Sequence, residues 1–243
     1  MNLVVDIGNT RTKAALYSGN SLIEFHTLKN PKELFKSGLI EKCSKIIISS
    51  VAETDDFFIE LLKLKETILF TTQTQIPIIN DYKSISTLGS DRLLASVGAY
   101  FLYPKSNVLV IDAGTCIKYN FTNSDNHYLG GGISPGITMK LKSLHDYTAK
   151  LPLIEFDENF NLLIGDSTQH SILSGVLNGT IAEIDGIINT YKLHYPDLIC
   201  LLTGGDSEYL ANRLKNSIFT HQNLVLKGLN DILNYTIEIN ANK

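Results

Sequence analysis

Two short turns, each following an apolar run and an aspartate, carry the residues best suited to chemistry. Residues 4–10 read V-V-D-I-G-N-T and residues 110–115 read V-I-D-A-G-T, and a second strand-like segment follows each turn. A strand ending in Asp, a glycine turn and a returning strand form a hairpin whose tip presents backbone N–H groups and one carboxylate. We expect the two tips to face each other across a cleft and to bind a polyphosphate with its metal.

The first turn carries the larger set of groups that can bind an anion. Gly8 permits a sharp turn and close approach of a ligand. The residues after it can donate hydrogen bonds to anionic oxygens: Asn9, Thr10, Arg11, Thr12 and Lys13. A plain hairpin is the alternative, because D-x-G and N-T are common in turns. The recurrence of the pattern at residues 112–115 favours a paired site.

Charge repulsion makes a metal ion part of this expectation. Two carboxylates facing an ATP tail repel it, and each unit pair at ~4 Å costs about 4 kcal/mol at an effective dielectric of 20. A site containing Asp6 and Asp112 therefore holds ATP only with cations between the charges. Mg²⁺, which binds one or two carboxylates together with phosphate oxygens, meets that requirement.

Several other classes of site are excluded by the sequence. Gly-Lys never occurs as a dipeptide, which excludes a Walker loop, and G-x-G-x-x-G is missing. The six histidines lack the spacings of zinc sites. A net charge of −4 without a basic run predicts no nucleic-acid binding. No signal peptide and no apolar run of ~20 residues is evident, so we expect a cytoplasmic protein without a membrane attachment.

Two further motifs are candidates for substrate and nucleotide binding. In L-G-S-D-R, residues 88–92, Asp91 falls in the first turn of an expected helix, where the helix dipole favours an ionised carboxylate that can accept a proton. In L-T-G-G-D, residues 202–206, Gly204 and Gly205 allow a flat group such as adenine to lie against the backbone. Taken alone, each motif is better interpreted structurally, as a helix start and as a turn between a strand and a helix.

Glycines are concentrated in two other places. The stretch L-G-G-G-I-S-P-G, residues 129–136, is interpreted as a lid, a hinge, a close approach for substrate or a wide turn. Within an expected helix at 167–195, small residues share one face at spacings of 4, 3 and 4: Gly175, Gly179, Ala182 and Gly186. Because glycine inside a helix costs about 1 kcal/mol relative to alanine, this face is expected to admit a close helix neighbour, within the domain or across a two-fold subunit interface.

The elements that would position these groups occur twice in tandem. We expect strands at 3–6, 12–17, 22–28, 45–49 and 67–70, and helices at 31–37, 55–64 and 90–103, the last capped by Ser90. Residues 81–88 are expected to be a loop. After a seam near 104–107 we expect strands at 107–112, 115–121, 127–129 and 198–202, with helices at 136–147, 167–195, from 206 and from 223. The pattern predicts a duplicated α/β unit with domains at 1–105 and 106–243.

Taken in order, these motifs resemble those of type III pantothenate kinases, in the superfamily of acetate and sugar kinases, heat-shock chaperones and actin. The resemblance covers essentially the whole chain and rests on six segments: D-I-G-N-T-R-T-K, Y-K-S-I-S-T-L-G-S-D-R, D-A-G-T, G-G-G-I-S-P-G with T-A-K-L-P, S-T-Q-H-S-I-L-S-G and T-G-G. It implies an α/β fold of two tandem ribonuclease-H-like (actin-like ATPase) domains, each a mixed sheet with flanking helices. It also implies ATP-dependent phosphorylation of pantothenate at its terminal hydroxyl to 4'-phosphopantothenate, the first step of coenzyme A biosynthesis.

The resemblance also implies a role for each matching residue. Asp91 would be the catalytic base, and pantothenate would be bound by Tyr82, Gly89, Ser90, Asp91, Arg92 and Thr168. The implied nucleotide contacts are Asp6, Ile7, Gly8, Asn9, Thr10, Arg11, Thr12, Lys13 and Thr115, with adenosine near Gly204 and Gly205. Mg²⁺ would accompany ATP, and Asp112 would hold a monovalent cation, K⁺ or NH₄⁺. Family members are homodimers whose substrate pocket is completed by the partner subunit.

The chain departs from the family pattern at several positions. After D-x-G-T the family commonly reads A-x-T-x-D, whereas this chain has Cys116, Lys118 and Asn120 at the variant sites. Lys118 can point toward the cation region and displace the monovalent ion. Ile85 replaces a frequent proline in the pantothenate segment. Two alternatives stay open: a sugar or N-acetylhexosamine kinase of the same fold, and a nucleotide-binding regulator or chaperone-like module without transfer chemistry.

Overall fold

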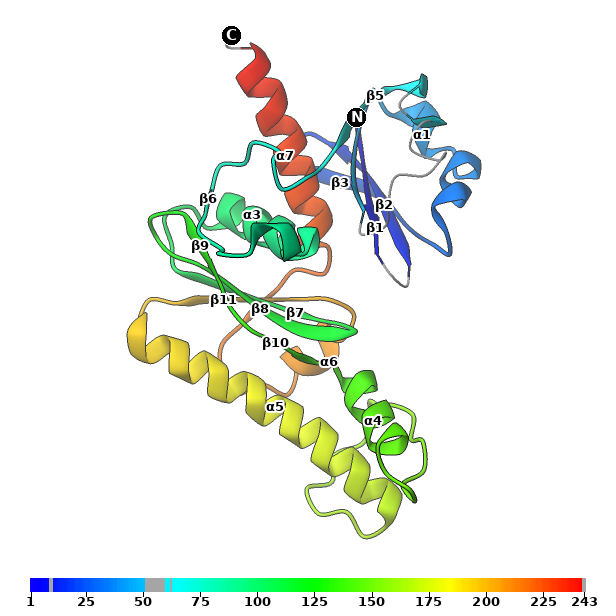
Figure 1. The fold of residues 1–243 in the computed structure, drawn as a ribbon, viewed down its shortest axis with the longest axis vertical. Helices are drawn as coiled ribbons and strands as arrows, with labels where there is room; N and C mark the ends of the chain where they lie inside the picture. Colours follow the sequence, from blue (N-terminus) through cyan, green and yellow to red (C-terminus); the bar gives the residue numbers. More distant parts are fainter. Residues whose placement is uncertain (9–10, 51–59, 62, 242–243) are drawn as a thin grey trace. The chain divides into compact units, whose positions relative to one another are not determined.

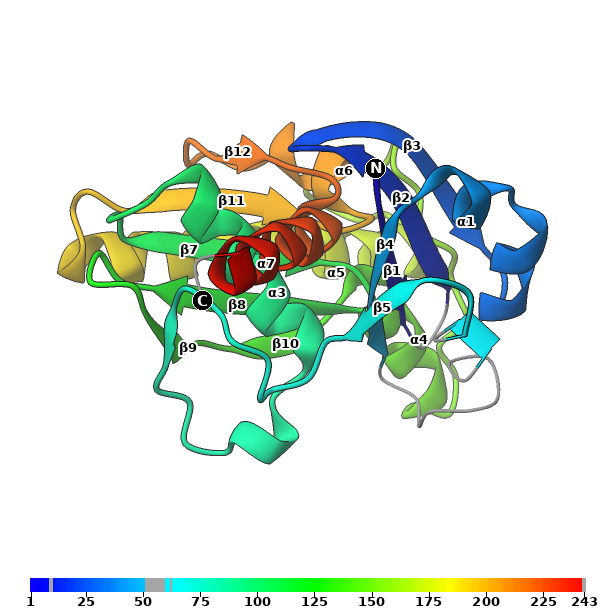
Figure 2. The same ribbon diagram turned by 90° about the horizontal axis from the view of Figure 1, so that it is seen from above.

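The chain folds into two compact units. The computed structural model describes residues 1–8, 11–50, 60–61 and 63–241 (Figures 1 and 2). Unit 1 comprises Met1–Lys105, Thr122–Leu129 and Asn223–Lys243, and unit 2 comprises Ser106–Phe121 and Gly130–Gln222. Each unit has its own buried core, so each is described by itself.

Unit 1 is built on a five-stranded mixed sheet in the order β3-β2-β1-β4-β5. β2 pairs antiparallel with β1 and β3, while β4 pairs parallel with β1 and β5. β6 and β9 pair parallel with each other. The elements of the unit are β1 (Asn2–Ile7), β2 (Thr12–Ser18), β3 (Ser21–Leu28), η1 (Pro31–Lys36), α1 (Leu39–Lys42), β4 (Lys45–Ser50), β5 (Glu66–Leu69), β6 (Ile79–Asn80), η2 (Ile85–Thr87), α3 (Ser90–Leu102), β9 (His127–Gly130) and α7 (Leu224–Ala241).

The central strands of this sheet are apolar on both faces because both faces are covered. Side chains alternate between the two faces of a strand. In β1, Leu3 and Val5 enter the cluster that contains Leu34 from η1, whereas Val4 enters the cluster that contains Leu229 from α7. The continuous apolar run at the start of the sequence therefore reflects a sheet covered on both sides.

Helices α3 and α7 lie side by side in Figures 1 and 2 and contact each other along their length. Glycines allow this approach. A Cβ atom at Gly228 would lie 2.0 Å from the backbone oxygen of Leu94, and one at Gly98 would lie 2.7 Å from the backbone oxygen of Leu224. The last helix of the chain is thereby fixed against the helix that begins with the L-G-S-D-R motif.

Unit 2 is built on strands β12, β11, β7 and β8 in that order, and β10 also pairs with β8. β11 pairs parallel with β7 and β12, and β10 pairs antiparallel with β8. The elements of the unit are β7 (Val108–Ala113), β8 (Cys116–Thr122), β10 (Ile133–Pro135), α4 (Ile137–Asp146), α5 (Thr168–His194), β11 (Ile199–Thr203), α6 (Ser207–Ala211) and β12 (Phe219–Thr220).

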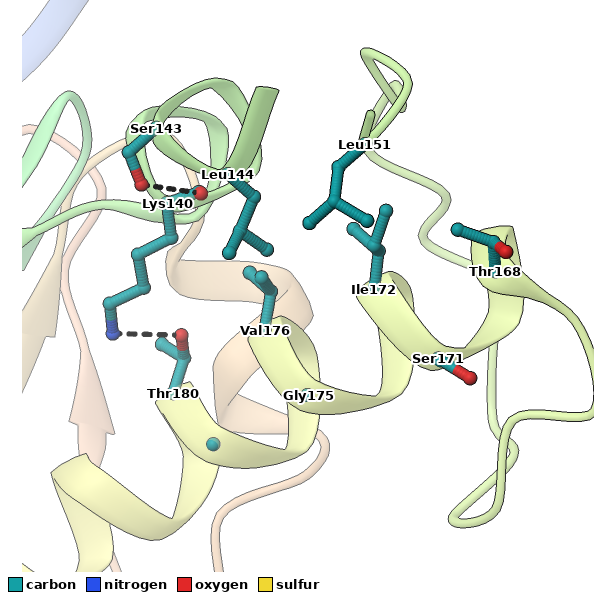
Figure 3. Close-up of a pocket in the computed structure, with 11 residues that line it drawn as sticks. Lys140, Ser143, Leu144, Leu151, Thr168, Ser171, Ile172, Gly175, Val176 and Thr180 are labelled. Carbon is teal, nitrogen blue, oxygen red and sulfur yellow. Dashed lines mark hydrogen bonds between the residues drawn. The ribbon is translucent and has the colours of Figure 1, made fainter. Parts of the chain in front are cut away.

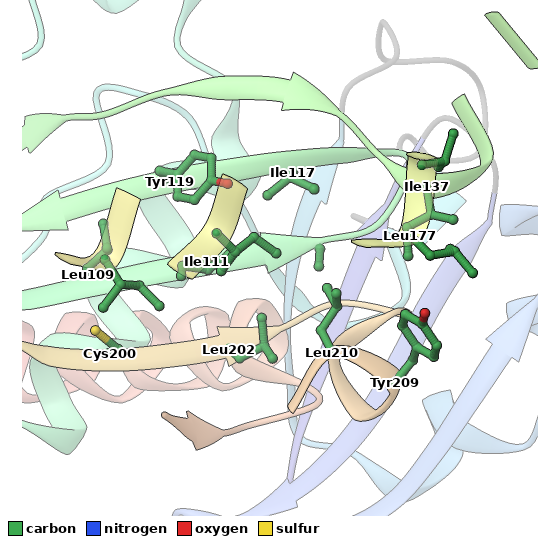
Figure 4. Packing of buried hydrophobic residues seen from close by; sticks show 14 of the residues in the cluster. Leu109, Ile111, Ile117, Tyr119, Ile137, Leu177, Cys200, Leu202, Tyr209 and Leu210 are labelled. Carbon is green, nitrogen blue, oxygen red and sulfur yellow. The ribbon is translucent and has the colours of Figure 1, made fainter. Parts of the chain in front are cut away.

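The core of unit 2 lies between this sheet and the helices that pack on it. Figure 4 shows Ile111 of β7, Ile117 of β8 and Leu177 of α5 among the buried side chains. By length and composition, α5 is the one helix in the described ranges that could cross a membrane, and half of its most apolar window is buried. A core helix passes the same test, and the packing of α5 fits that interpretation.

The predicted α/β fold class, with mixed sheets and flanking helices, is confirmed. The predicted long elements all occur within a few residues of their expected ends, except the helix at 55–64, most of which lies outside the described residues. Five of the shortest described elements were not predicted from the sequence. These are α1, β6, β10, β12 and the single turn η2, which falls in the expected loop at 81–88.

Candidate active site

The first acidic turn closes through its glycine. The N–H of Gly8 donates to the backbone oxygen of Arg11 at 3.1 Å, and Asp6 on β1 lies opposite Lys13 on β2. Thr12 is buried and Ile7 packs in the core of unit 1. The side chain of Ile7 is therefore buried in the core, and only the backbone of this residue can face a ligand. Asn9 and Thr10 lie outside the described residues.

The turn is joined to the L-G-S-D-R motif through β4. Asp6 lies beside Ser49 in the parallel pairing of β1 with β4. The buried hydroxyl of Ser49 donates to the hydroxyl of Ser90 at 2.9 Å. The carboxyl end of β1 and the start of α3 are therefore neighbours within unit 1, and the expected phosphate turn lies close to the expected base.

Asp91 lies in the first turn of α3, as the sequence predicts, but the cap differs from the prediction. Gly89 is the N-cap residue, with no side-chain capping bond, and Ser90 is already helical. The capping role expected for Ser90 is therefore wrong, because its hydroxyl bonds Ser49 instead. Oδ1 of Asp91 accepts the N–H of Arg92 at 2.8 Å. This bond holds the carboxylate at the start of the helix.

The side chains of Arg92 and Tyr82 lie together. Arg92 is only 5% exposed, and its guanidinium donates to the hydroxyl of Tyr82 at 3.4 Å and lies 5.3 Å from the centre of the ring. The backbone N–H of Tyr82 donates to the side chain of Asn80 at 3.1 Å. A cation on an aromatic face is a favourable arrangement. Unit 1 thus brings five of the six residues expected to bind pantothenate to one end of α3.

The second acidic turn follows β7 in unit 2 and also closes through its glycine. The N–H of Gly114 donates to the backbone oxygen of Cys116 at 3.1 Å, and Thr115 is exposed at the tip. The carboxylate of Asp112 forms an ion pair of 2.9 Å with the ammonium of Lys118. The aspartate of the second turn is therefore already paired with a positively charged side chain, that of Lys118.

The T-G-G-D segment lies directly against this turn. Gly204 has a φ of 95°, and a Cβ atom there would lie 2.2 Å from the backbone oxygen of Ala113 and 2.7 Å from Oδ1 of Asp112. The N–H of Asp206 donates to the same oxygen of Ala113 at 3.0 Å. Burial raises the pKa of the Asp206 carboxyl, and the charge of Asp112 raises it further. A Cβ atom at Gly205 would meet nothing within 4 Å in the described chain.

The glycine-rich stretch is not a wide turn. It forms β10, which pairs with β8, and the start of α4. A Cβ atom at Gly131 would lie 2.0 Å from the backbone oxygen of Tyr119, and one at Gly136 would lie 2.0 Å from that of Gly114. Close backbone approach therefore explains these glycines, and one of them supports the second acidic turn.

Thr168 begins α5 in unit 2 and lines a cavity of about 740 Å³ between α4 and α5 (Figure 3). The other residues expected to bind pantothenate belong to unit 1. A Cβ atom at Gly175, Gly179 or Gly186 would meet nothing within 4 Å in the described part of the chain. The expectation of a close helix neighbour within the domain is therefore wrong for this face, because the face is open.

Sequence reasoning missed a partly buried polar cluster that connects β10, α4 and α5. The carboxylate of Glu183 on α5 accepts hydrogen bonds from Tyr119 at 3.0 Å, from Lys140 at 2.6 Å and from Ser134. Burial raises the pKa of Glu183, but these hydrogen bonds lower it to a net value below its ordinary one. Ser49 and Asp206 were missed as well. The signal in the sequence was a pair of acidic residues, Glu183 and Asp185, in a largely uncharged stretch of α5.

The donor chemistry fits one expected ion and not the other. Asp6 supplies a carboxylate oxygen at the end of β1, which suits Mg²⁺. Asp112 already faces the ammonium of Lys118, so this position does not suit a further monovalent cation. Among the described residues, no group of three or more His, Cys, Asp or Glu side chains could hold a metal by itself. A metal here would therefore depend on ligand oxygens from a substrate.

Comparison with known proteins identifies the family. The profile of type III pantothenate kinases matches residues 2–190. The type III pantothenate kinase of Flavobacterium johnsoniae is 43% identical over 98% of this chain and 99% of its own length, and that of Bacteroides fragilis is 41% identical over 97% and 98%. The chain belongs to the type III pantothenate kinase family.

Solved structures share the fold at lower identity. A chain from Campylobacter jejuni, described as a Baf family transcriptional activator, has a TM-score of 0.66 at 23% identity, covering 97% of this chain and 99% of that one. A glucokinase from an Antarctic psychrotroph has a TM-score of 0.51 at 13% identity, covering 96% and 98%. These two likenesses concern the fold alone, and the family assignment rests on the sequence relatives.

Proposed function

We propose that this chain transfers the γ-phosphoryl group of ATP to the terminal hydroxyl of pantothenate, the first step of coenzyme A biosynthesis. The observation that carries the proposal is the family match over residues 2–190, which spans both acidic turns and the segment around Asp91. The relatives named type III pantothenate kinase match nearly the whole chain at 38–43% identity. A sugar kinase or a nucleotide-binding regulator has no comparable support.

In this proposal, the end of α3 binds the acceptor. Asp91 accepts the proton of the attacking hydroxyl, while Arg92 and Tyr82 contact pantothenate with Gly89, Ser90 and Thr168. Phosphoryl transfer does not require a base of unusual strength, because its transition state is loose and the main task of the base is to position the attacking hydroxyl. The hydrogen bond from the N–H of Arg92 to Asp91 supports this role, since it fixes the position of the carboxylate.

The two acidic turns bind the nucleotide in this proposal. The first turn, from Asp6 to Lys13, contacts the phosphates together with Thr115 of the second, and adenosine lies near Gly204 and Gly205. The open space beside Gly205 supports a flat group at that position. Mg²⁺, held by Asp6 and phosphate oxygens, would neutralise charge on the phosphates.

We also propose a cytoplasmic homodimer whose pocket is completed by the partner subunit. The face of α5 with Gly175 and Gly179 is open, and a cavity next to it is lined by Thr168 and by apolar side chains. Leu163 and Ile164, just before α5, are also largely exposed. A second copy would cover these groups. Within each subunit, the proposed domains at 1–105 and 106–243 would be the two duplicated halves of the chain.

An ATP-consumption assay with pantothenate, pantetheine and hexoses as acceptors tests the proposed function. We expect pantothenate to stimulate ADP release and to gain one phosphoryl group by mass spectrometry. Stimulation by a hexose without stimulation by pantothenate would overturn the proposal in favour of a sugar kinase. Binding of ATP without turnover on any acceptor would overturn it in favour of a regulator.

For the dimer, light scattering of the wild type should give twice the mass of one chain. The variant Gly179→Arg should give the mass of one chain, because a long charged side chain cannot be buried at a close helix contact. As a control, Lys142→Arg replaces one exposed cation of α4 by another and should leave the mass unchanged. A monomeric wild type at micromolar concentration would contradict this part of the proposal.

A further inference from the structure

The second acidic turn contains more negative charge than its aspartate alone. Asp206, at the start of α6, bonds the backbone of the same turn, and the charges of Asp112 and Asp206 act on each other. Two neighbouring carboxylates favour a cation between or beside them. If ATP binds here as proposed, its phosphates add further negative charge. The turn therefore needs a positive charge, whatever group supplies it.

A positive charge is supplied by Lys118 on β8, the strand that follows the turn. Ile111 and Ala113 on β7 enter the core of unit 2, and so do Ile117 and Tyr119 on β8. Because side chains alternate along a strand, Asp112 and Lys118 both project from the opposite face. The two side chains are mostly covered, with 16% of Asp112 and 23% of Lys118 exposed, and they form the 2.9 Å ion pair.

The backbone on which Lys118 sits is held firmly. Lys118 lies opposite Ile133 in the pairing of β8 with β10. The neighbouring Tyr119 exchanges backbone hydrogen bonds with Gly132 at 2.8 and 3.1 Å, and its hydroxyl donates to the carboxylate of Glu183 at 3.0 Å. The backbone of Lys118 is therefore held by the pairing of β8 with β10, and its ammonium group is held by Asp112.

We propose that the ammonium group of Lys118 takes the place of the monovalent cation expected at Asp112, so that this chain needs no added K⁺ or NH₄⁺. The inference rests on the proposed function. A lysine ammonium is a compact point charge with three N–H donors, which makes it a chemical match for a bound ammonium ion. Because it is tethered, it stays at the turn at any salt composition.

Salt exchange on the wild-type protein tests this inference. Binding of a non-hydrolysable ATP analogue with Mg²⁺ is measured by calorimetry in KCl, NH₄Cl, NaCl and tetramethylammonium chloride at one ionic strength, and kcat with pantothenate is measured in the same buffers. We expect Kd and kcat to agree within about twofold among the four salts. A rise of about tenfold or more in affinity or kcat with K⁺ or NH₄⁺ over tetramethylammonium would overturn the inference.

The variant Lys118→Ala supplies the complementary test. It leaves Asp112 without its ammonium, so we expect analogue affinity to fall about tenfold in tetramethylammonium and to recover in K⁺ or NH₄⁺. Lys227→Ala is the matched control, because Lys227 forms a comparable covered ion pair with Asp231 on α7. It should show no difference among the salts. Lys118→Gln provides the same test if the alanine variant does not fold.

Indifference of the folded Lys118 variants to the choice of salt would also overturn the inference. If the proposed function itself is wrong, the salt experiments give a different result. In that case no salt supports phosphorylation of pantothenate by the wild type, while the calorimetric comparison of wild type and Lys118→Ala still decides whether Lys118 supplies the charge at Asp112.

Discussion

Replacing Asp91 by asparagine separates its proposed chemical role from its structural role. Oδ1 of Asp91 accepts the N–H of Arg92 at 2.8 Å, and an asparagine side chain retains an acceptor oxygen of the same size at that position. The structural loss is then the charge at the start of α3, which is worth about 0.3–1 kcal/mol near a helix N-terminus. For a chain of this length, that predicts a fall in Tm of about 1–4 °C.

The expected loss of activity is far larger. General base catalysis contributes about 100- to 10,000-fold in rate, or about 2.7–5.4 kcal/mol in the barrier. We therefore expect Asp91→Asn to lower kcat with pantothenate by at least about 100-fold. Its affinity for an ATP analogue should stay near that of the wild type, because the carboxylate contacts the acceptor in the proposed mechanism.

The assay combines steady-state kinetics, calorimetry with the ATP analogue and thermal unfolding on the same preparations. Glu41→Gln is the control, because Glu41 lies exposed in the first turn of α1 and loses the same kind of charge. This control should keep wild-type kcat. A kcat of Asp91→Asn within about threefold of the wild type, in a folded protein, would refute the role of Asp91 as the base.

Three other substitutions test the packing and the turns. Gly228→Ala places a Cβ atom 2.0 Å from a backbone oxygen of α3, and urea unfolding should show a loss of about 1–3 kcal/mol despite the better helix propensity of alanine. Gly204→Ala forces a side chain into a φ of 95°, a strain of about 1–3 kcal/mol, so calorimetry should show an analogue Kd about tenfold higher. Burial raises the pKa of the Asp185 carboxyl. Hydrogen bonds from the side chain of Asn216 and from the backbone N–H groups of Lys215 and Asn216 lower it by more, so its pKa in the folded protein lies below the ordinary value of 3.8. Its stabilising contribution is therefore present above about pH 4 and lost as the pH falls through the folded pKa, and Asp185→Asn should remove this contribution from an acid-unfolding curve.

The long elements could be predicted from the sequence because their signal is local. The apolar run of β1 and the 3.6-residue periodicity of α3 each persist over several residues, and burial of those faces determines the element. β10 and β12 are only three and two residues long. Strands that short exist because a neighbouring strand offers hydrogen bonds, which no periodicity within them records.

Around the candidate residues, the local turns and the helix start were predictable from the sequence, but their contacts with distant segments were not. The motifs around Gly8, Asp91 and Gly204 were found because turns and helix starts require particular residue types. The glycine at 136 was found but misinterpreted, because its cause is the backbone of Gly114, which approaches from another segment. Ser90 was misassigned for a similar reason, since a partner on β4 takes its hydroxyl. Contacts between distant segments depend on the assembled fold.

The packing of α7 against α3 has a consequence for biosynthesis. Every element of unit 2 precedes residue 223, whereas unit 1 includes the helix from Leu224 to Ala241. A ribosome makes the sheet of unit 1 first and supplies its covering helix last. While the later unit is being made, one apolar face of the amino-terminal sheet is covered by α3 but lacks α7. Chaperones that shield apolar surfaces would act on it during this interval.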